Sequence, residues 1–216
     1  MPEPVSSNRD WGISLGPVIG SSLRYIWICD VSDSMRHGNR IGELNTAIEK
    51  AITSLKEFSK KIPAVQIFMR TIKFSTGAEW VDSDFVPLKK YQWRPLETDK
   101  GETDLGEALS KVAEALRFKK DGGLMPEARL RMPNLILITD GFPTDDWESG
   151  LKKLDSTVWG KNAIRMVVAL GDAADDDESM EVLRQFVGNV PGAHRRICSS
   201  GMIGEGLISE GYVLYS

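Results

Sequence analysis

The most constraining feature of the sequence is an uninterrupted apolar run, residues 25–29, that stops at the carboxylate of Asp30. Its residues are aromatic, β-branched or otherwise apolar and hardly alternate, which is typical of a strand buried on both faces of a parallel sheet. Open α/β sheets bind ligands in the crevice at the carboxyl ends of their strands. We therefore expect Asp30, Ser32 and Ser34 to lie at such a crevice.

Two further stretches end in compatible chemistry. Residues 134–139 form a second apolar run that stops at Asp140, and Thr103 stands just ahead of a helix-like run. Carboxylate and hydroxyl oxygens are hard ligands that suit Mg²⁺ better than Zn²⁺ or copper. Three loops can therefore supply one cation site. The candidate metal ligands are Asp30, Ser32, Ser34, Thr103 and Asp140.

These motifs, in this order, closely resemble the metal-ion-dependent adhesion site of von Willebrand factor A (vWA) domains. The motifs are Asp30-x-Ser32-x-Ser34, Thr103 near the middle, and Ile138-Thr139-Asp140-Gly141. Within that superfamily, residues 138–147 and 102–106 look most like the bacterial tellurium-resistance TerY-type proteins. The resemblance extends over residues 23–198, which is most of the chain.

The resemblance implies a Mg²⁺ ion, with Mn²⁺ or Ca²⁺ as alternatives. Ser32, Ser34 and Thr103 would contribute hydroxyls, while Asp30 and Asp140 would act directly or through water. It implies a protein-interaction domain of a bacterial stress or defence system, in which the ion takes a carboxylate from a partner's Asp or Glu. TerY-type relatives are associated with kinase-like proteins and metal-dependent protein phosphatases, so we expect partners of these kinds.

One residue departs from the family pattern. Many vWA domains have glycine between the two serines, whereas this chain has Asp33. An inward Asp33 would raise cation affinity and weaken capture of an acidic partner. The middle residue of an alternating trio faces away from its neighbours, which favours an outward Asp33 with little effect.

The pattern of elements predicts an α/β protein with a Rossmann-like vWA fold. Helical spacing of apolar residues predicts helices over 42–60, 105–118, 147–154 and 180–187, and strand-like runs cover 24–30, 64–74, 135–139, 163–170 and 195–199. Residues 78–81 are expected to form an antiparallel edge strand. Alternating strands and helices imply a mostly parallel sheet of about six strands with helices on both faces. We assign residues 1–22 to an N-terminal arm and 23–216 to the vWA domain.

Charge and hydropathy narrow the expected partners and location. The net charge of −4 and the pI near 5.4 argue against nucleic acid and anionic membranes as main partners, since both favour clustered Lys and Arg. No apolar run approaches the ~20 residues that span a membrane. Residues 1–20 lack the basic and apolar segments of a signal peptide. These features predict a cytoplasmic protein.

The sequence also allows other functions. A Mg²⁺-dependent phosphatase or other hydrolase is the alternative, but aspartyl phosphatases need a second carboxylate two residues after the nucleophile, where this chain has Ser32. We therefore expect no enzymatic activity and no catalytic residues. A structural subunit that has lost metal dependence is a third hypothesis. A fourth is that Asp30 and Asp140 merely cap turns. For the acidic residues 172–178, a solvated helix start is favoured over calcium binding.

Overall fold

The structure is a computed structural model that describes residues 21–127, 131–171, 176–188 and 197–198. Within these residues, seven strands form one sheet. The strands are β1 (Ser21–Asp30), β2 (Val65–Ser75), β3 (Gly77–Trp80), β4 (Val86–Pro87), β5 (Asn134–Thr139), β6 (Ile164–Ala169) and β7 (Ile197–Cys198). Six of them follow the order β3-β2-β1-β5-β6-β7, and β4 pairs with β2 beside this path.

The sheet is mostly parallel, as the sequence predicts. Strands β1, β2, β5, β6 and β7 run in one direction. Only β3 and β4 are antiparallel to β2, and β3 matches the edge strand predicted over 78–81. Because β1 lies between β2 and β5, the loops that leave these three strands meet at one edge of the sheet.

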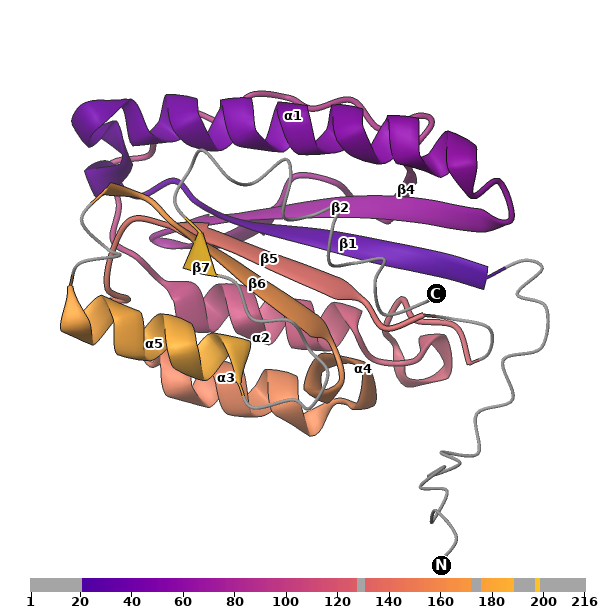
Figure 1. The fold of residues 1–216 in the computed structure, drawn as a ribbon. Helices are drawn as coiled ribbons and strands as arrows, with labels where there is room; N and C mark the ends of the chain where they lie inside the picture. Colours follow the sequence, from indigo (N-terminus) through magenta and orange to yellow (C-terminus); the bar gives the residue numbers. More distant parts are fainter. Residues whose placement is uncertain (1–20, 128–130, 172–175, 189–196, 199–216) are drawn as a thin grey trace, which may run out of the picture.

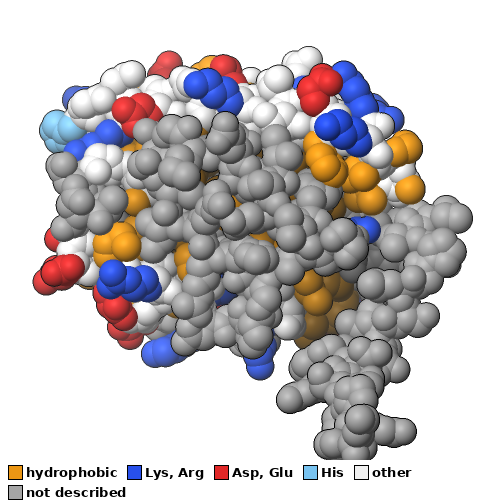
Figure 2. Space-filling model, viewed as in Figure 1, with side chains coloured by type: hydrophobic (Ala, Val, Ile, Leu, Met, Phe, Trp, Pro, Cys, Tyr) orange, Lys and Arg blue, Asp and Glu red, His pale blue; other side chains and the backbone are white. Residues whose placement is uncertain are grey.

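Helices cover both faces of the sheet. The α-helices are α1 (Arg40–Lys61), α2 (Leu105–Ala115), α3 (Trp147–Ser156), α4 (Val158–Lys161) and α5 (Asp177–Val187), and the 3₁₀ helices are η1 (Asp33–Asn39) and η2 (Lys119–Asp121). Figure 1 shows α1 on one face and α2, α3 and α5 on the other. Figure 2 shows acidic and basic side chains close together on the outer surface over α1. One exposed ion pair on this helix joins Glu57 and Lys60.

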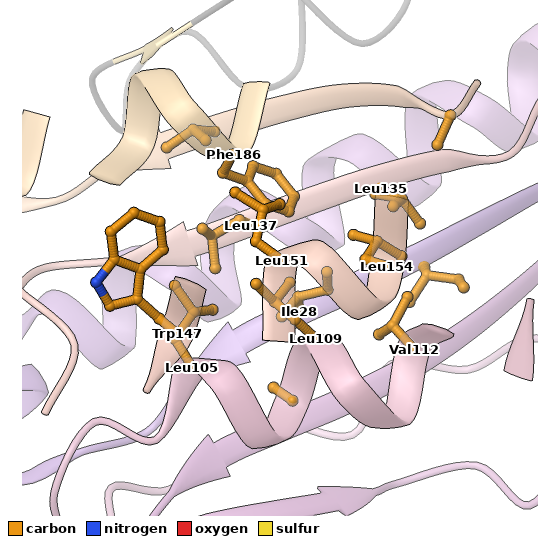
Figure 3. Close-up of a cluster of buried hydrophobic side chains, with 14 of the residues drawn as sticks. Ile28, Leu105, Leu109, Val112, Leu135, Leu137, Trp147, Leu151, Leu154 and Phe186 are labelled. Carbon is orange, nitrogen blue, oxygen red and sulfur yellow. The ribbon is translucent and has the colours of Figure 1, made fainter. Parts of the chain in front are cut away.

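The two faces of β1 explain its unbroken apolar sequence. Tyr25, Trp27 and Cys29 are buried in the core layer that includes α1. Ile26 and Ile28 are buried in the opposite layer, together with side chains of α2, α3 and α5. In Figure 3, Ile28 lies among the leucines of α2, α3 and β5. Burial of each such aliphatic side chain contributes about 1.5–3 kcal/mol.

The predicted elements are present with modest shifts at their ends. Strand β1 begins at Ser21, three residues before the predicted start, and α1 begins at Arg40 rather than at residue 42. Two short elements, β4 and α4, were not predicted. The connection over 82–100 is anchored by aromatic residues: Tyr91 is buried, and Trp93 Nε1 donates to Asn45 Oδ1 at 3.1 Å.

Some predictions fall outside the described residues. These include the N-terminal arm up to residue 20 and most of the acidic stretch over 172–178. At the end of that stretch, Asp176 caps α5 by accepting a hydrogen bond from the Ser179 amide at 2.7 Å, as expected of a helix start. Among the described helices, none has the length and apolar character needed to cross a membrane.

Candidate metal site at the carboxyl edge of the sheet

The carboxyl ends of β1 and β5 bring the two predicted aspartates into one cluster. The strands are parallel neighbours, with Cys29 opposite Ile138, so the two strands end at the same level of the sheet. The Thr139 hydroxyl donates to Asp30 Oδ2 at 2.6 Å and fixes the end of β5 to the end of β1. The site therefore begins with two adjacent strand ends rather than with one loop.

A chain of hydroxyls joins the serine loop to Asp140. The Ser34 hydroxyl donates to Asp140 Oδ1 at 2.7 Å, and the Ser32 and Ser34 hydroxyl oxygens are 3.1 Å apart. Ser32 is buried and Ser34 is partly exposed, so the pair reaches from the interior to the surface.

Asp30 is the most deeply buried member of the cluster. Its side chain is shielded from solvent, and it accepts hydrogen bonds from the Ser32 amide at 2.9 Å and from Thr139. Burial raises the pKa of Asp30 to about 6, against the opposing effect of these hydrogen bonds and with a further increase from the nearby Asp140. A carboxylate in such a place favours a compensating positive charge.

Asp140 has a partner that sequence reasoning missed. Arg40 Nη1 donates to Asp140 Oδ2 at 2.8 Å, while the Asp140 side chain is fully buried and that of Arg40 is 17% exposed. No motif contains this arginine. The one hint is its charge, because a basic residue at the start of a helix opposes the helix dipole and so calls for a nearby anion.

Thr103 lies on a third loop that is tied to the other two. Its backbone amide donates to Thr144 Oγ1 at 2.9 Å, and the Thr144 amide returns a bond to the Thr103 carbonyl at 3.0 Å. The Asp33 amide donates to the Gly101 carbonyl at 3.2 Å, which links this loop to the serines. Thr103 is 8% exposed. Within the described chain, its hydroxyl makes no hydrogen bond to the other four candidate ligands.

Asp33 points away from the cluster, as its alternating position predicts. Its side chain is 60% exposed and pairs with Arg36 at 3.1 Å, between Oδ1 and Nε. It therefore adds little negative charge to the interior of the site. This exposed pair is screened by water and contributes little stability.

The donor set fits a hard divalent cation. The cluster offers oxygen atoms from two buried carboxylates and from the hydroxyls of Ser32 and Ser34, with a third hydroxyl on the adjoining loop. No group of three or more His, Cys, Asp or Glu side chains that could hold a metal occurs among the described residues. A metal held here would therefore depend on neutral hydroxyls, which is the donor pattern of the sequence prediction.

The architecture of the described residues and the position of the cluster in it are evident before any comparison with other proteins. The fold is a Rossmann-like α/β sheet, mostly parallel, with the oxygen-rich loops at the carboxyl ends of its strands. No protein-family model matches the chain, and no curated protein matches it. The assignment of fold therefore rests on solved structures.

Three of these solved structures illustrate the likeness. VWA2, a paralog of ArnB from Sulfolobus acidocaldarius, has a TM-score of 0.58 at 18% identity, over 87% of this chain and 44% of that one. Proximal thread matrix protein 1 of the mussel byssus, with a zinc-occupied MIDAS (metal-ion-dependent adhesion site) motif, has a TM-score of 0.52 at 14% identity. The match covers 87% of this chain and 46% of that one. The pilus adhesin SpaC from Lactobacillus rhamnosus GG has a TM-score of 0.60 at 15% identity, over 90% of this chain and 30% of that one.

Sequence identities this low show a common fold alone. The vWA fold predicted from the motifs is confirmed, whereas the link to TerY-type proteins stays a prediction. This chain spans less than half the length of each of the three proteins.

Proposed function

We propose that this chain is a metal-dependent protein-interaction module, whose cation is held by Asp30, Ser32, Ser34, Thr103 and Asp140. The observation that carries the proposal is the 3.1 Å separation of the Ser32 and Ser34 hydroxyl oxygens. Neighbouring ligands of an octahedral Mg²⁺ ion, each 2.0–2.1 Å from the metal, lie roughly 2.9 Å apart. The two serines are thus spaced as adjacent ligands of one ion.

Mg²⁺ is the proposed ion, with Mn²⁺ or Ca²⁺ as alternatives. The donors are oxygens, whereas Zn²⁺ prefers nitrogen and sulfur, so the zinc of the mussel protein is not carried over to this chain. When bound, the ion would offer a coordination position to a carboxylate oxygen from a partner's Asp or Glu. The neutral serine and threonine hydroxyls would leave part of its charge uncompensated, and this favours an anionic partner.

The proposed setting is a bacterial stress or defence system of the TerY type, in the cytoplasm. Its support is the resemblance of residues 138–147 and 102–106 to TerY-type proteins, which also suggests a kinase-like protein or a metal-dependent protein phosphatase as partner. The partner's recognised group is a carboxylate in either case.

The proposal assigns no catalytic residue. A phosphatase of the aspartyl class with Asp30 as its nucleophile would need a second carboxylate as general acid. The general acid expected two positions later is replaced by Ser32, which has no acidic proton to give. We expect no metal-dependent hydrolysis of a generic phosphate ester.

Thermal unfolding with and without metal tests the proposal. Titration with Mg²⁺, Mn²⁺, Ca²⁺ or Zn²⁺ should raise the Tm of the wild-type protein above its value in EDTA, because a ligand at a hundred times its Kd stabilises by about 2.7 kcal/mol. The increase in Tm should be larger with Mg²⁺, Mn²⁺ or Ca²⁺, which prefer oxygen ligands, than with Zn²⁺. Ser34→Ala and Asp140→Asn should lose most of this increase.

Asp33→Asn is the matched control, since it removes a carboxylate from the same loop but from an exposed side chain. It should keep the full metal response. If the wild-type protein melts at one temperature in EDTA and in every metal, the site assignment is wrong. Recovery of bound partners with and without EDTA then separates a metal-dependent module from a structural subunit that needs no metal.

A further inference from the structure

Arg40 lies where it can change the charge of the site without being a ligand. Its guanidinium donates to Asp140 Oδ2, and the opposite oxygen of the same carboxylate accepts from Ser34. Asp140 is thus held between a candidate ligand and a permanent positive charge. Arg40 is also the first residue of α1, where the helix dipole disfavours a cation, so its position is offset by the pair with Asp140.

The chain leaves a specific space for this guanidinium. Gly171 follows β6 with a φ of +56°, and a Cβ there would lie 2.2 Å from Arg40 Nε and 2.5 Å from Nη2. Any larger residue would push the arginine away from its place. The residue before Arg40, Asn39, has a φ of +65°, a left-handed conformation that non-glycine residues seldom adopt. One residue with a left-handed backbone thus precedes Arg40 in the sequence, and another lies against its guanidinium.

We propose that Arg40 is the specificity-determining residue of this site. It lowers the affinity of the site for the cation and raises the affinity of the cation-loaded site for an anionic side chain. This inference rests on the proposed function. Arg40 acts through Asp140 and through its charge, and it is not itself a metal ligand.

The reason is the balance of charge in a buried place. The carboxylates of Asp30 and Asp140 would together neutralise a divalent ion, and an ion so neutralised attracts a further carboxylate poorly. The guanidinium of Arg40 cancels one of the two negative charges, so that the loaded site keeps a net positive charge. Since both aspartate side chains are buried, water screens these interactions less than it would at the surface.

Metal affinity, measured with the metal alone, tests the proposal. Isothermal titration with Mn²⁺ and Mg²⁺ should show that Arg40→Gln binds the ion on the order of tenfold more tightly than wild type, since one nearby charge is worth at least ~1.4 kcal/mol here. Arg40→Lys keeps the charge and should stay close to the wild-type Kd. Arg36→Gln, which removes an exposed arginine paired with Asp33, is the matched control and should change nothing.

Anion capture gives the second readout. With metal at saturation, a fluorescent peptide with a single central Glu should bind wild type and Arg40→Lys more tightly than Arg40→Gln, as measured by anisotropy. A peptide with Gln in place of that Glu should bind none of them. The two effects of Arg40→Gln have opposite signs, which a merely structural role would not produce.

The outcomes separate this inference from the function it rests on. If Arg40→Gln binds metal equally or more weakly, Arg40 only supports the fold and the inference is overturned. If wild type binds no metal, the proposed function fails first. Should Arg40→Gln not fold, Gly171→Ala provides the test, because it displaces the guanidinium without removing its charge from the chain. That variant should also bind metal more tightly, and an unchanged Kd would overturn the inference.

Discussion

The Thr139 hydroxyl donates a 2.6 Å hydrogen bond to Asp30 Oδ2, and so joins the carboxyl ends of two neighbouring parallel strands, β5 and β1. Both side chains are almost completely shielded from solvent. The bond is part of the framework of the site, since it orients the Asp30 carboxylate from the neighbouring strand.

Loss of this bond should destabilise the metal-free protein. Thr139→Val keeps the shape of the side chain but leaves Asp30 Oδ2 buried without that donor, at an expected cost of about 1–3 kcal/mol. Thr139→Ser retains the hydroxyl and is the control. Urea unfolding in EDTA measures both free energies, and equal midpoints for the two variants would contradict the assignment.

A second buried pair should show strong coupling between its members. The Tyr91 hydroxyl and Thr71 Oγ1 are 2.5 Å apart, and burial raises the pKa of Tyr91 so that it stays protonated. Tyr91→Phe should cost about 1–3 kcal/mol by leaving Thr71 unpaired. The double variant Tyr91→Phe, Thr71→Val should cost less than the two single changes added together, and a denaturant double-mutant cycle tests this. Additive costs would mean that the hydroxyls do not interact.

Truncation of the core beneath α2 should be expensive. Leu109 is fully buried among side chains of α2, α3 and the sheet (Figure 3), and Leu109→Ala should lower the unfolding free energy by about 2–5 kcal/mol. Glu114→Ala, on the same helix, removes only an exposed pair with Lys153 and should cost less than about 1 kcal/mol. Comparable losses from both would show that α2 is not packed as described.

The cap of α3 should make stability depend on acid pH. Asp146 accepts hydrogen bonds from the hydroxyl and amide of Ser149, and these lower its pKa below the usual value. Its contribution is therefore complete above the ordinary aspartate pKa and is lost as the pH falls through the lowered one. Asp146→Asn keeps a capping oxygen that does not titrate.

The Tm of the wild type should consequently fall relative to that of Asp146→Asn as the pH drops below about 4. Asp146→Ala should melt lower than both near neutral pH, because it has no cap at all. A wild-type-minus-Asn difference that is constant from neutral to strongly acid pH would show that the carboxylate makes no net contribution through its charge.

The sheet, and the placing of Asp30 and Asp140 at one edge of it, could be predicted from the sequence because both depend on local patterns. The apolar runs that become β1 and β5 each end in an aspartate, and parallel neighbours place those ends together. The hydroxyl spacing of Ser32 and Ser34 is equally local. The outward direction of Asp33 followed from its place between them, and the structure confirms it.

The parts that were missed depend on tertiary contacts. Strand β4 has two residues and helix α4 has four, so neither holds a periodic pattern. The pairing of Arg40 with Asp140 joins residues 100 positions apart and belongs to no motif. The space for its guanidinium is left by Gly171, whose role shows only when the chain after β6 comes next to the first residue of α1.

The Ser34 to Asp140 hydrogen bond spans 106 positions of the chain. A shorter polypeptide that stopped before β5 would carry the serines and yet have no second wall for them to face. Anything that bridges these residues also closes a long loop, and so works as a reversible staple across the whole sheet. Binding of an ion to this small cluster should for that reason stabilise the whole sheet against global unfolding, and not only the three loops.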